Sequence, residues 1–188
     1  MLAELRRIVS LSEKEYLKLI PLTERIKVKK REHLLKAGEI SRKVYFIEKG
    51  CLRQYLVNKD GDERNIYFKV EGGWCSELES FLNNKPTDLN IQALEDSDLI
   101  SFNQKNWIHA VTRIPPFTLY FIKAQQETNY MLKKRLGEAT IESPEEKYNR
   151  FIIEEPKLLQ RLPLFQIALY LGITPETLSR IRKKMSLH

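Results

Sequence analysis

Short runs rich in β-forming residues, separated by turn signals, occupy the first half of the chain. They lie at residues 44–47, 52–57, 66–70, 89–94 and 99–102, and glycines recur between the earlier runs about every 11 to 12 residues. In the third run, Ile66, Phe68 and Val70 alternate with other residues, as expected for a strand with one buried face. Residues 59–62 contain the Asp-Gly pair of a tight hairpin. This pattern predicts an antiparallel β-roll.

Helical patterns lie on both sides of the β-rich half. Ser12 and Ser143 each precede a glutamate by three residues, the signature of a capping box at a helix start. Residues 115–137 start with a pair of prolines and contain no further proline, and no glycine before Gly137. This predicts a helix of roughly 34 Å. Pro156 is expected to end the helix that starts after Ser143.

These patterns predict an α+β chain with three parts. Residues 1–114 form the β-roll, 115–140 a long connecting helix, and 141–188 a small helical domain. The expected boundary between the roll and the helical domain follows the change in composition near residues 137–143.

Residues 163–185 carry the most specific local signal. Pro163 starts one short apolar helix, Gly172 breaks it, and Thr174 with Pro175 starts another, because threonine caps a helix and proline is favoured in its first turn. Two short helices joined by a three- or four-residue turn with glycine predict a helix-turn-helix. Ala168 suits the point at which the two helices cross.

The second of these helices is amphipathic. At 100° per residue, Leu178, Ile181 and Met185 form one apolar stripe, while three polar side chains lie on the opposite face: Glu176, Arg180 and Lys183. A polar face of this kind fits the major groove of DNA. From the spacing alone, an ordinary surface helix with a solvated ion pair between positions 176 and 180 stays open.

Residues 167–181 strongly resemble the helix-turn-helix of the cyclic-AMP receptor protein and fumarate-nitrate regulator (CRP/FNR) family. The resemblance covers nearly the whole chain. It implies a jelly-roll β-domain like the cyclic-nucleotide-binding one, a dimerisation helix, and a transcription regulator that binds double-stranded DNA at two-fold sites as a homodimer. Base contacts are implied for Glu176 and Arg180. The full set of expected DNA-binding residues is Thr174, Glu176, Thr177, Ser179, Arg180, Lys183 and Lys184.

Two features depart from the family pattern in the DNA-binding domain. Pro175 stands where a basic residue often precedes the glutamate, so one base contact is expected to be absent or replaced. Only Ser186, Leu187 and His188 follow Met185, so most of the β-hairpin wing is expected to be missing.

The long helix is expected to form the dimer seam, because a two-fold DNA site demands a two-fold protein. Thr128 and Asn129 interrupt its apolar pattern near the middle and are candidates for coupling an effector to the dimer, or for a polar register lock. The expected seam follows a 4-3-4-3 spacing with an adjacent stripe: Phe117, Phe121, Ala124, Thr128 and Met131, beside Ile122, Gln125, Asn129, Leu132 and Leu136.

The cyclic-nucleotide cassette of the family is degenerate here. Glu77 matches the glutamate that contacts the ribose, but Ser76 replaces the preceding glycine. Thr87 and Asp88 fall where the family has the arginine-serine pair that holds the cyclic phosphate, so the cation is lost and an anion is added. We therefore expect a regulator that does not respond to cyclic AMP. The alternatives are a cyclic-nucleotide-responsive member of the same family and a protein-interaction module without DNA binding.

Composition narrows the remaining classes. The formal net charge of +7 permits a polyanionic partner. Two cysteines do not make a disulfide framework or an iron–sulfur site, and three scattered histidines make no metal or haem centre. We expect no cofactor and no enzyme activity, because no catalytic motif is present. With no signal peptide or membrane-spanning run apparent, a cytoplasmic protein is expected, with an effector still unidentified.

Overall fold

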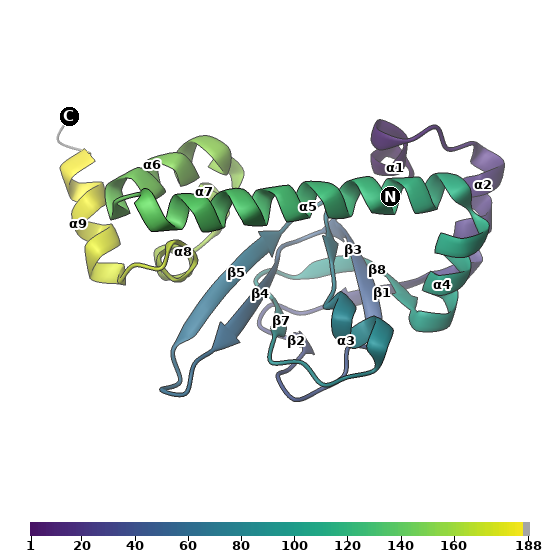
Figure 1. The fold of residues 1–188 in the computed structure, drawn as a ribbon, viewed down its shortest axis with the longest axis horizontal. Helices are drawn as coiled ribbons and strands as arrows, with labels where there is room; N and C mark the ends of the chain where they lie inside the picture. Colours follow the sequence, from purple (N-terminus) through teal and green to yellow (C-terminus); the bar gives the residue numbers. More distant parts are fainter. Residues whose placement is uncertain (186–188) are drawn as a thin grey trace.

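The computed structural model describes residues 1–185, apart from the side chains of residues 138–140. A long helix, α5, runs across a β-roll, with a helical domain at one end and the N-terminal helices at the other (Figure 1). The elements before the long helix are α1 (Leu2–Ile8), α2 (Glu13–Leu19), the 3-10 helix η1 (Ile20–Leu22), β1 (Glu24–Val28), β2 (His33–Leu35), β3 (Lys43–Lys49), β4 (Leu52–Val57), β5 (Glu63–Lys69), β6 (Trp74–Cys75), α3 (Leu78–Asn83), β7 (Asn90–Ala93), β8 (Ser97–Asn103) and α4 (Gln104–Arg113). They are followed by α5 (Pro115–Ile141), α6 (Pro144–Glu154), α7 (Pro156–Arg161), α8 (Leu164–Leu171) and α9 (Pro175–Met185).

Two antiparallel sheets form the β-roll. One has the strand order β1-β8-β3-β6 and the other β2-β7-β4-β5. The space between them is filled by apolar side chains from both sheets, among them Ile47, Leu52, Ile91 and Leu99, each at most 1% exposed. Burial of each such side chain contributes about 1.5–3 kcal/mol. The predicted α+β fold, with a β-roll, a long helix and a helix-turn-helix, is confirmed, and β4 begins and ends where the sequence pattern places it.

Both predicted capping boxes form. Ser12 accepts a hydrogen bond from the Glu15 backbone, and Ser143 from the Glu146 backbone, while each glutamate accepts one from its serine's N–H. The pattern did not predict α1, α4 or the very short strands β2 and β6. Pro156 begins α7 directly after α6, because proline is well placed in a first helical turn.

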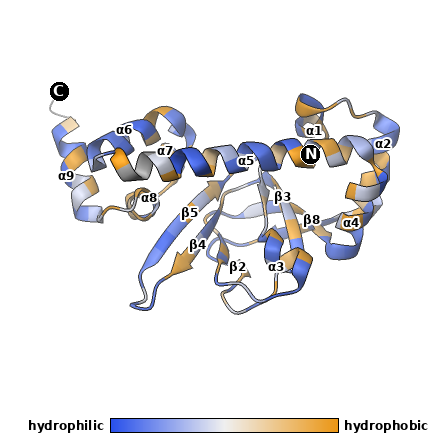
Figure 2. Ribbon diagram, in the orientation of Figure 1, coloured by the Kyte–Doolittle hydropathy of each residue, from blue (hydrophilic) through white to orange (hydrophobic). Residues whose placement is uncertain are grey.

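The long helix does not end at Gly137. It continues to Ile141, since a glycine inside a helix costs only about 1 kcal/mol and the next strong stop is the Ser143 cap. The middle of α5 is mostly hydrophilic, whereas the stretch beside α4 is more apolar (Figure 2).

The first predicted seam stripe of α5 faces the chain's own β-roll. Phe117 is 1% exposed, and the Phe121 ring lies edge-on to Trp107 with centroids 4.9 Å apart. The apolar side chains that follow the 4-3-4-3 spacing are therefore covered largely by the same chain. The spacing alone could not show this, because it fits any apolar partner. The outward face carries exposed apolar residues instead: Leu119, Ile122, Tyr130 and Leu136.

Candidate functional site

The helix-turn-helix is built from α8, a three-residue turn and α9. Gly172 caps α8 in the left-handed conformation, at φ 69°, and its N–H bonds to the Ala168 carbonyl at 2.9 Å. The Thr174 hydroxyl accepts a hydrogen bond from the Thr177 N–H at 3.2 Å and caps α9. Ala168 is fully buried, so the two helices cross closely at a position that holds only a methyl group.

One face of α9 is buried and the other is exposed. Leu178 and Ile181 pack into the helical domain, as predicted, whereas Met185 is 42% exposed and lies outside that core. The exposed positions are Glu176, Ser179, Arg180, Lys183 and Lys184, with Thr177 half-buried. The predicted DNA-binding residues are thus brought together at one helix and its cap, although most of them already interact within the chain.

Thr174 and Thr177 bond to each other and cap the helix, and Lys184 pairs with Glu145 of α6 at 3.0 Å. The Glu176 carboxylate turns back to the N-terminus of α9: hydrogen bonds from its own N–H and from Thr174 hold its pKa below the usual range. Arg180 forms no hydrogen bond or ion pair with any residue in the described part of the chain. Its guanidinium is therefore available to an outside partner.

The helical domain docks on the β-roll through buried polar contacts that the sequence did not reveal. We call the contact of α7 and α8 with the β-roll the junction. Asn65 of β5 donates to the Gln166 side chain at 2.8 Å and to its main-chain carbonyl at 3.0 Å. Arg53 of β4, 4% exposed, donates to Gln166 at 3.3 Å and to Gln92 at 2.9 Å, and it pairs with Glu63. Each of these buried polar groups therefore has a partner.

Arg161 at the end of α7 forms the outer part of the junction. Its guanidinium binds Glu71 at 2.8 and 3.0 Å and Glu95 at 2.6 and 3.0 Å. These hydrogen bonds, together with one from the Gly50 N–H, hold the pKa of Glu71 at about 2. Arg161 thus ties the helical domain to two loops of the roll.

A cavity of about 560 Å³, hereafter the roll cavity, lies between the β-roll and α5. Glu77 lines it, and its carboxylate caps α3 by accepting from the Ser80 N–H at 2.6 Å. Thr128 and Asn129 line it from α5, as the proposed coupling role requires. Thr87 and Asp88 are not part of its lining: Thr87 bonds to the turn at residues 38–39, and Asp88 is exposed.

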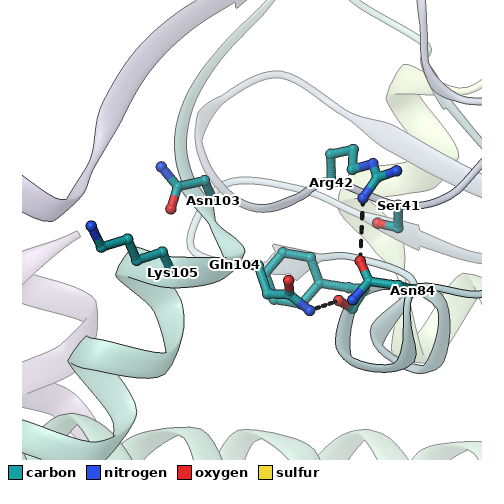
Figure 3. Close-up of a pocket in the computed structure, with 7 residues that line it drawn as sticks. Ser41, Arg42, Asn84, Asn103, Gln104 and Lys105 are labelled. Atoms are coloured by element: carbon teal, nitrogen blue, oxygen red, sulfur yellow. Dashed lines mark hydrogen bonds between the residues drawn. The ribbon is translucent and has the colours of Figure 1, made fainter.

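A smaller surface cavity of about 370 Å³ lies where α3 meets the start of α4 (Figure 3). Arg42 donates to Asn84 at 3.2 Å, and Gln104 donates to the Phe81 carbonyl at 2.6 Å, so these polar groups are used within the fold. Nothing in the sequence indicated this cavity. Because its polar side chains bond to one another or to the backbone, we assign it a structural role.

The residues considered for redox or metal chemistry lie apart. Cys51 and Cys75 are buried, and burial raises the pKa of each thiol to about 12. The His33 ring bonds to the Tyr55 hydroxyl at 2.9 Å. Among the described residues, no three side chains of the metal-binding types cluster, and no helix is both long and apolar enough to span a bilayer.

Comparison with known proteins agrees with this arrangement. Residues 25–113 match the cyclic nucleotide-binding domain family. The regulatory protein HlyX of Actinobacillus pleuropneumoniae is 26% identical over 187 residues, covering 92% of this chain and 76% of HlyX.

Solved structures share the fold. FixK2 from Bradyrhizobium japonicum superposes with a TM-score of 0.77 at 16% identity, covering 88% of this chain and 85% of FixK2. A Eubacterium rectale protein assigned to the CRP/FNR family of transcriptional regulators superposes with a TM-score of 0.73 at 16% identity, covering 94% of this chain and 81% of that one. The domain match at residues 25–113, the similarity to HlyX over most of the chain and the shared fold agree with the resemblance of the helix-turn-helix to that of the CRP/FNR family.

Proposed function

We propose that the protein is a cytoplasmic transcription regulator that binds two-fold DNA sites as a homodimer and does not respond to cyclic AMP. The observation that carries the proposal is the exposed face of α9, where Arg180 projects from a capped helix without a partner in the described chain. An arginine in this position can bind guanine O6 and N7 together. Four basic residues against one acidic residue in α9 favour the approach to phosphates.

The outward stripe of α5 supports the homodimer. Ile122 is 48% and Leu136 72% exposed, and neither belongs to the core cluster through which Phe117 packs on the roll. A second copy of the same helix would cover this stripe and present two α9 helices to one DNA duplex. The same pairing would bring Asn129, which is exposed, next to the seam.

The lack of response to cyclic AMP is supported by the lining of the roll cavity. No arginine stands at the position where the family pattern has the phosphate-binding one, and Thr87 and Asp88 are not part of the cavity lining. The arginine that does line the cavity, Arg135, donates to the Ile66 and Tyr170 carbonyls and stacks on the Tyr170 ring at 3.8 Å.

Operator selection from random duplex DNA with the purified protein, followed by affinity measurements at several salt concentrations, tests the proposal. We expect enrichment of a two-fold sequence, unchanged by millimolar cyclic AMP, with log affinity falling linearly with log salt. Binding that shows no sequence preference and no salt dependence would contradict the DNA-binding role. A cyclic-AMP-dependent rise in affinity would contradict only the effector part.

A further inference from the structure

Gln54 lies inside the β-roll, and its side chain has no hydrogen-bond partner in the part of the chain that the structure describes. It lies on β4 and is 2% exposed, and its partners on the two adjoining strands are Tyr67 of β5 and Ile91 of β7. Its side chain lines the roll cavity and bonds to none of the residues that the structure describes. A buried amide without a partner is unfavourable, so such groups in native proteins need a specific explanation.

A second buried glutamine shows what a structural role looks like in this chain. Gln166 is 4% exposed, yet its side chain accepts hydrogen bonds from Asn65 and Arg53. The two glutamines are equally buried and differ in that only Gln54 borders a cavity. We conclude that the amide of Gln54 is available to a molecule in that cavity.

Other polar groups of the roll cavity are also unused. The hydroxyls of Tyr67, Ser76 and Thr128 line it and bond to no described residue. Burial raises the pKa of Tyr67 far above its ordinary value, so this hydroxyl keeps its proton and can donate. Donors and acceptors therefore meet from β4, β5 and α5 around one space.

The charges around the roll cavity disfavour an anion. Five carboxylates line it against two cations, and of these Lys69 lies over the Tyr67 ring at 5.1 Å while Arg135 is engaged at the junction. The rest of the lining includes several aromatic rings: Phe68, Trp74, Tyr120 and Phe121. A volume of about 560 Å³ suits a small organic molecule.

We propose that the roll cavity binds an uncharged or cationic heteroaromatic molecule, whose polar edge pairs with the Gln54 amide and with the hydroxyls of Tyr67 and Thr128. This ligand class rests on the proposed function, because it would be the effector of the regulator. The Gln54 carboxamide offers one donor and one acceptor to a ring edge. The surrounding carboxylates distinguish this ligand class from an anionic nucleotide, because they repel a phosphate.

The first test compares the two buried glutamines in the full-length protein without added ligand. Gln166→Leu removes the side-chain acceptor of the hydrogen bonds from Asn65 and Arg53 and should lower the melting temperature by roughly 5 °C. Gln54→Leu keeps the side-chain volume and removes an amide that the fold does not use, so its melting temperature should equal or exceed that of the wild type. A loss in Gln54→Leu as large as in Gln166→Leu would overturn the proposal.

The second test uses matched probes that differ in charge: adenosine against cyclic AMP, and tryptamine against indole-3-acetate. We expect the uncharged or cationic member of at least one pair to raise the melting temperature of the wild type, and Gln54→Leu to lose that rise. Larger stabilisation by an anionic member, or no stabilisation by any of the four, would show that the ligand class is wrong. Sequence-specific DNA binding by the ligand-free protein is measured separately, so failure of the proposed function remains distinguishable.

Discussion

Arg161 and Arg180 belong to the same small helical domain but have opposite surroundings. Arg161 is held by two carboxylates at the junction, and its side chain is 25% exposed. Arg180 is exposed on α9 and bonds to no described residue. The difference separates two uses of arginine: a cation with partners inside the chain stabilises the docking of domains, and one without partners is available to an external ligand.

The largest expected effect comes from disrupting the proposed dimer, which would bring two copies of Arg180 to one DNA site. Ile122→Asp with Leu136→Lys charges the outward stripe of α5 and should give a monomer in sedimentation experiments. Operator affinity should fall about 100-fold or more, because the second half-site contact is no longer intramolecular. The matched control is Leu17→Asp with Ile153→Lys, which charges equally exposed apolar residues elsewhere. A double variant that remains dimeric would place the seam on another surface.

Arg180→Ala should have the next largest effect. It should weaken operator binding by roughly 10- to 100-fold and relax base preference at one position of each half-site. Its melting temperature should match the wild type, since the side chain has no partner to lose. If affinity and base preference both survive, α9 does not read DNA with this face.

Arg161→Ala should show the reverse profile. We expect a loss of about 1–2 kcal/mol in the free energy of unfolding, discounted for partial exposure, which corresponds to roughly 4 °C in melting temperature. The affinity of the folded protein for its operator should change far less than in Arg180→Ala. A stable Arg161→Ala variant with lost base preference would contradict the distinction drawn between the two arginines.

The Arg161 contact also predicts a pH dependence. The pKa of Glu71 is about 2 in the folded protein, below its ordinary value near 4.5. A depressed pKa contributes stability that is fully present above about pH 5 and is lost as the pH falls toward 2. Urea unfolding at several pH values should therefore show a shallower acid loss in Arg161→Ala. Identical acid slopes in both proteins would mean that another group controls the transition.

The smallest expected effect concerns phosphate contacts. Lys183→Ala should weaken binding to all DNA sequences alike and flatten the slope of log affinity against log salt by about one unit. Lys59→Ala, in the exposed turn between β4 and β5, provides the control that should leave the slope unchanged. Equal effects of the two substitutions would indicate that general net charge, and not α9, sets the salt dependence.

Local features of this protein were determined by the sequence itself. The capping boxes at Ser12 and Ser143, the strand β4 and the glycine turn at Gly172 depend on residues only a few positions apart. The amphipathic pattern of α9 likewise depends on its own periodicity, which is why its exposed face could be assigned in advance. These features sufficed for the overall fold and for the candidate DNA-binding face.

The choice of partner was decided only by the tertiary structure. The apolar spacing of Phe117 and Phe121 is the same whether the partner is a second chain or the chain's own roll, and folding places both on the roll. Arg53 and Gln166, 113 positions apart, meet only because α8 docks on the sheet. In the sequence, Gln54 is one polar residue in a predicted strand. Only the folded β-roll buries it beside a cavity. Periodicity specifies which face of an element is apolar, whereas burial and pairing depend on what distant segments bring to that face.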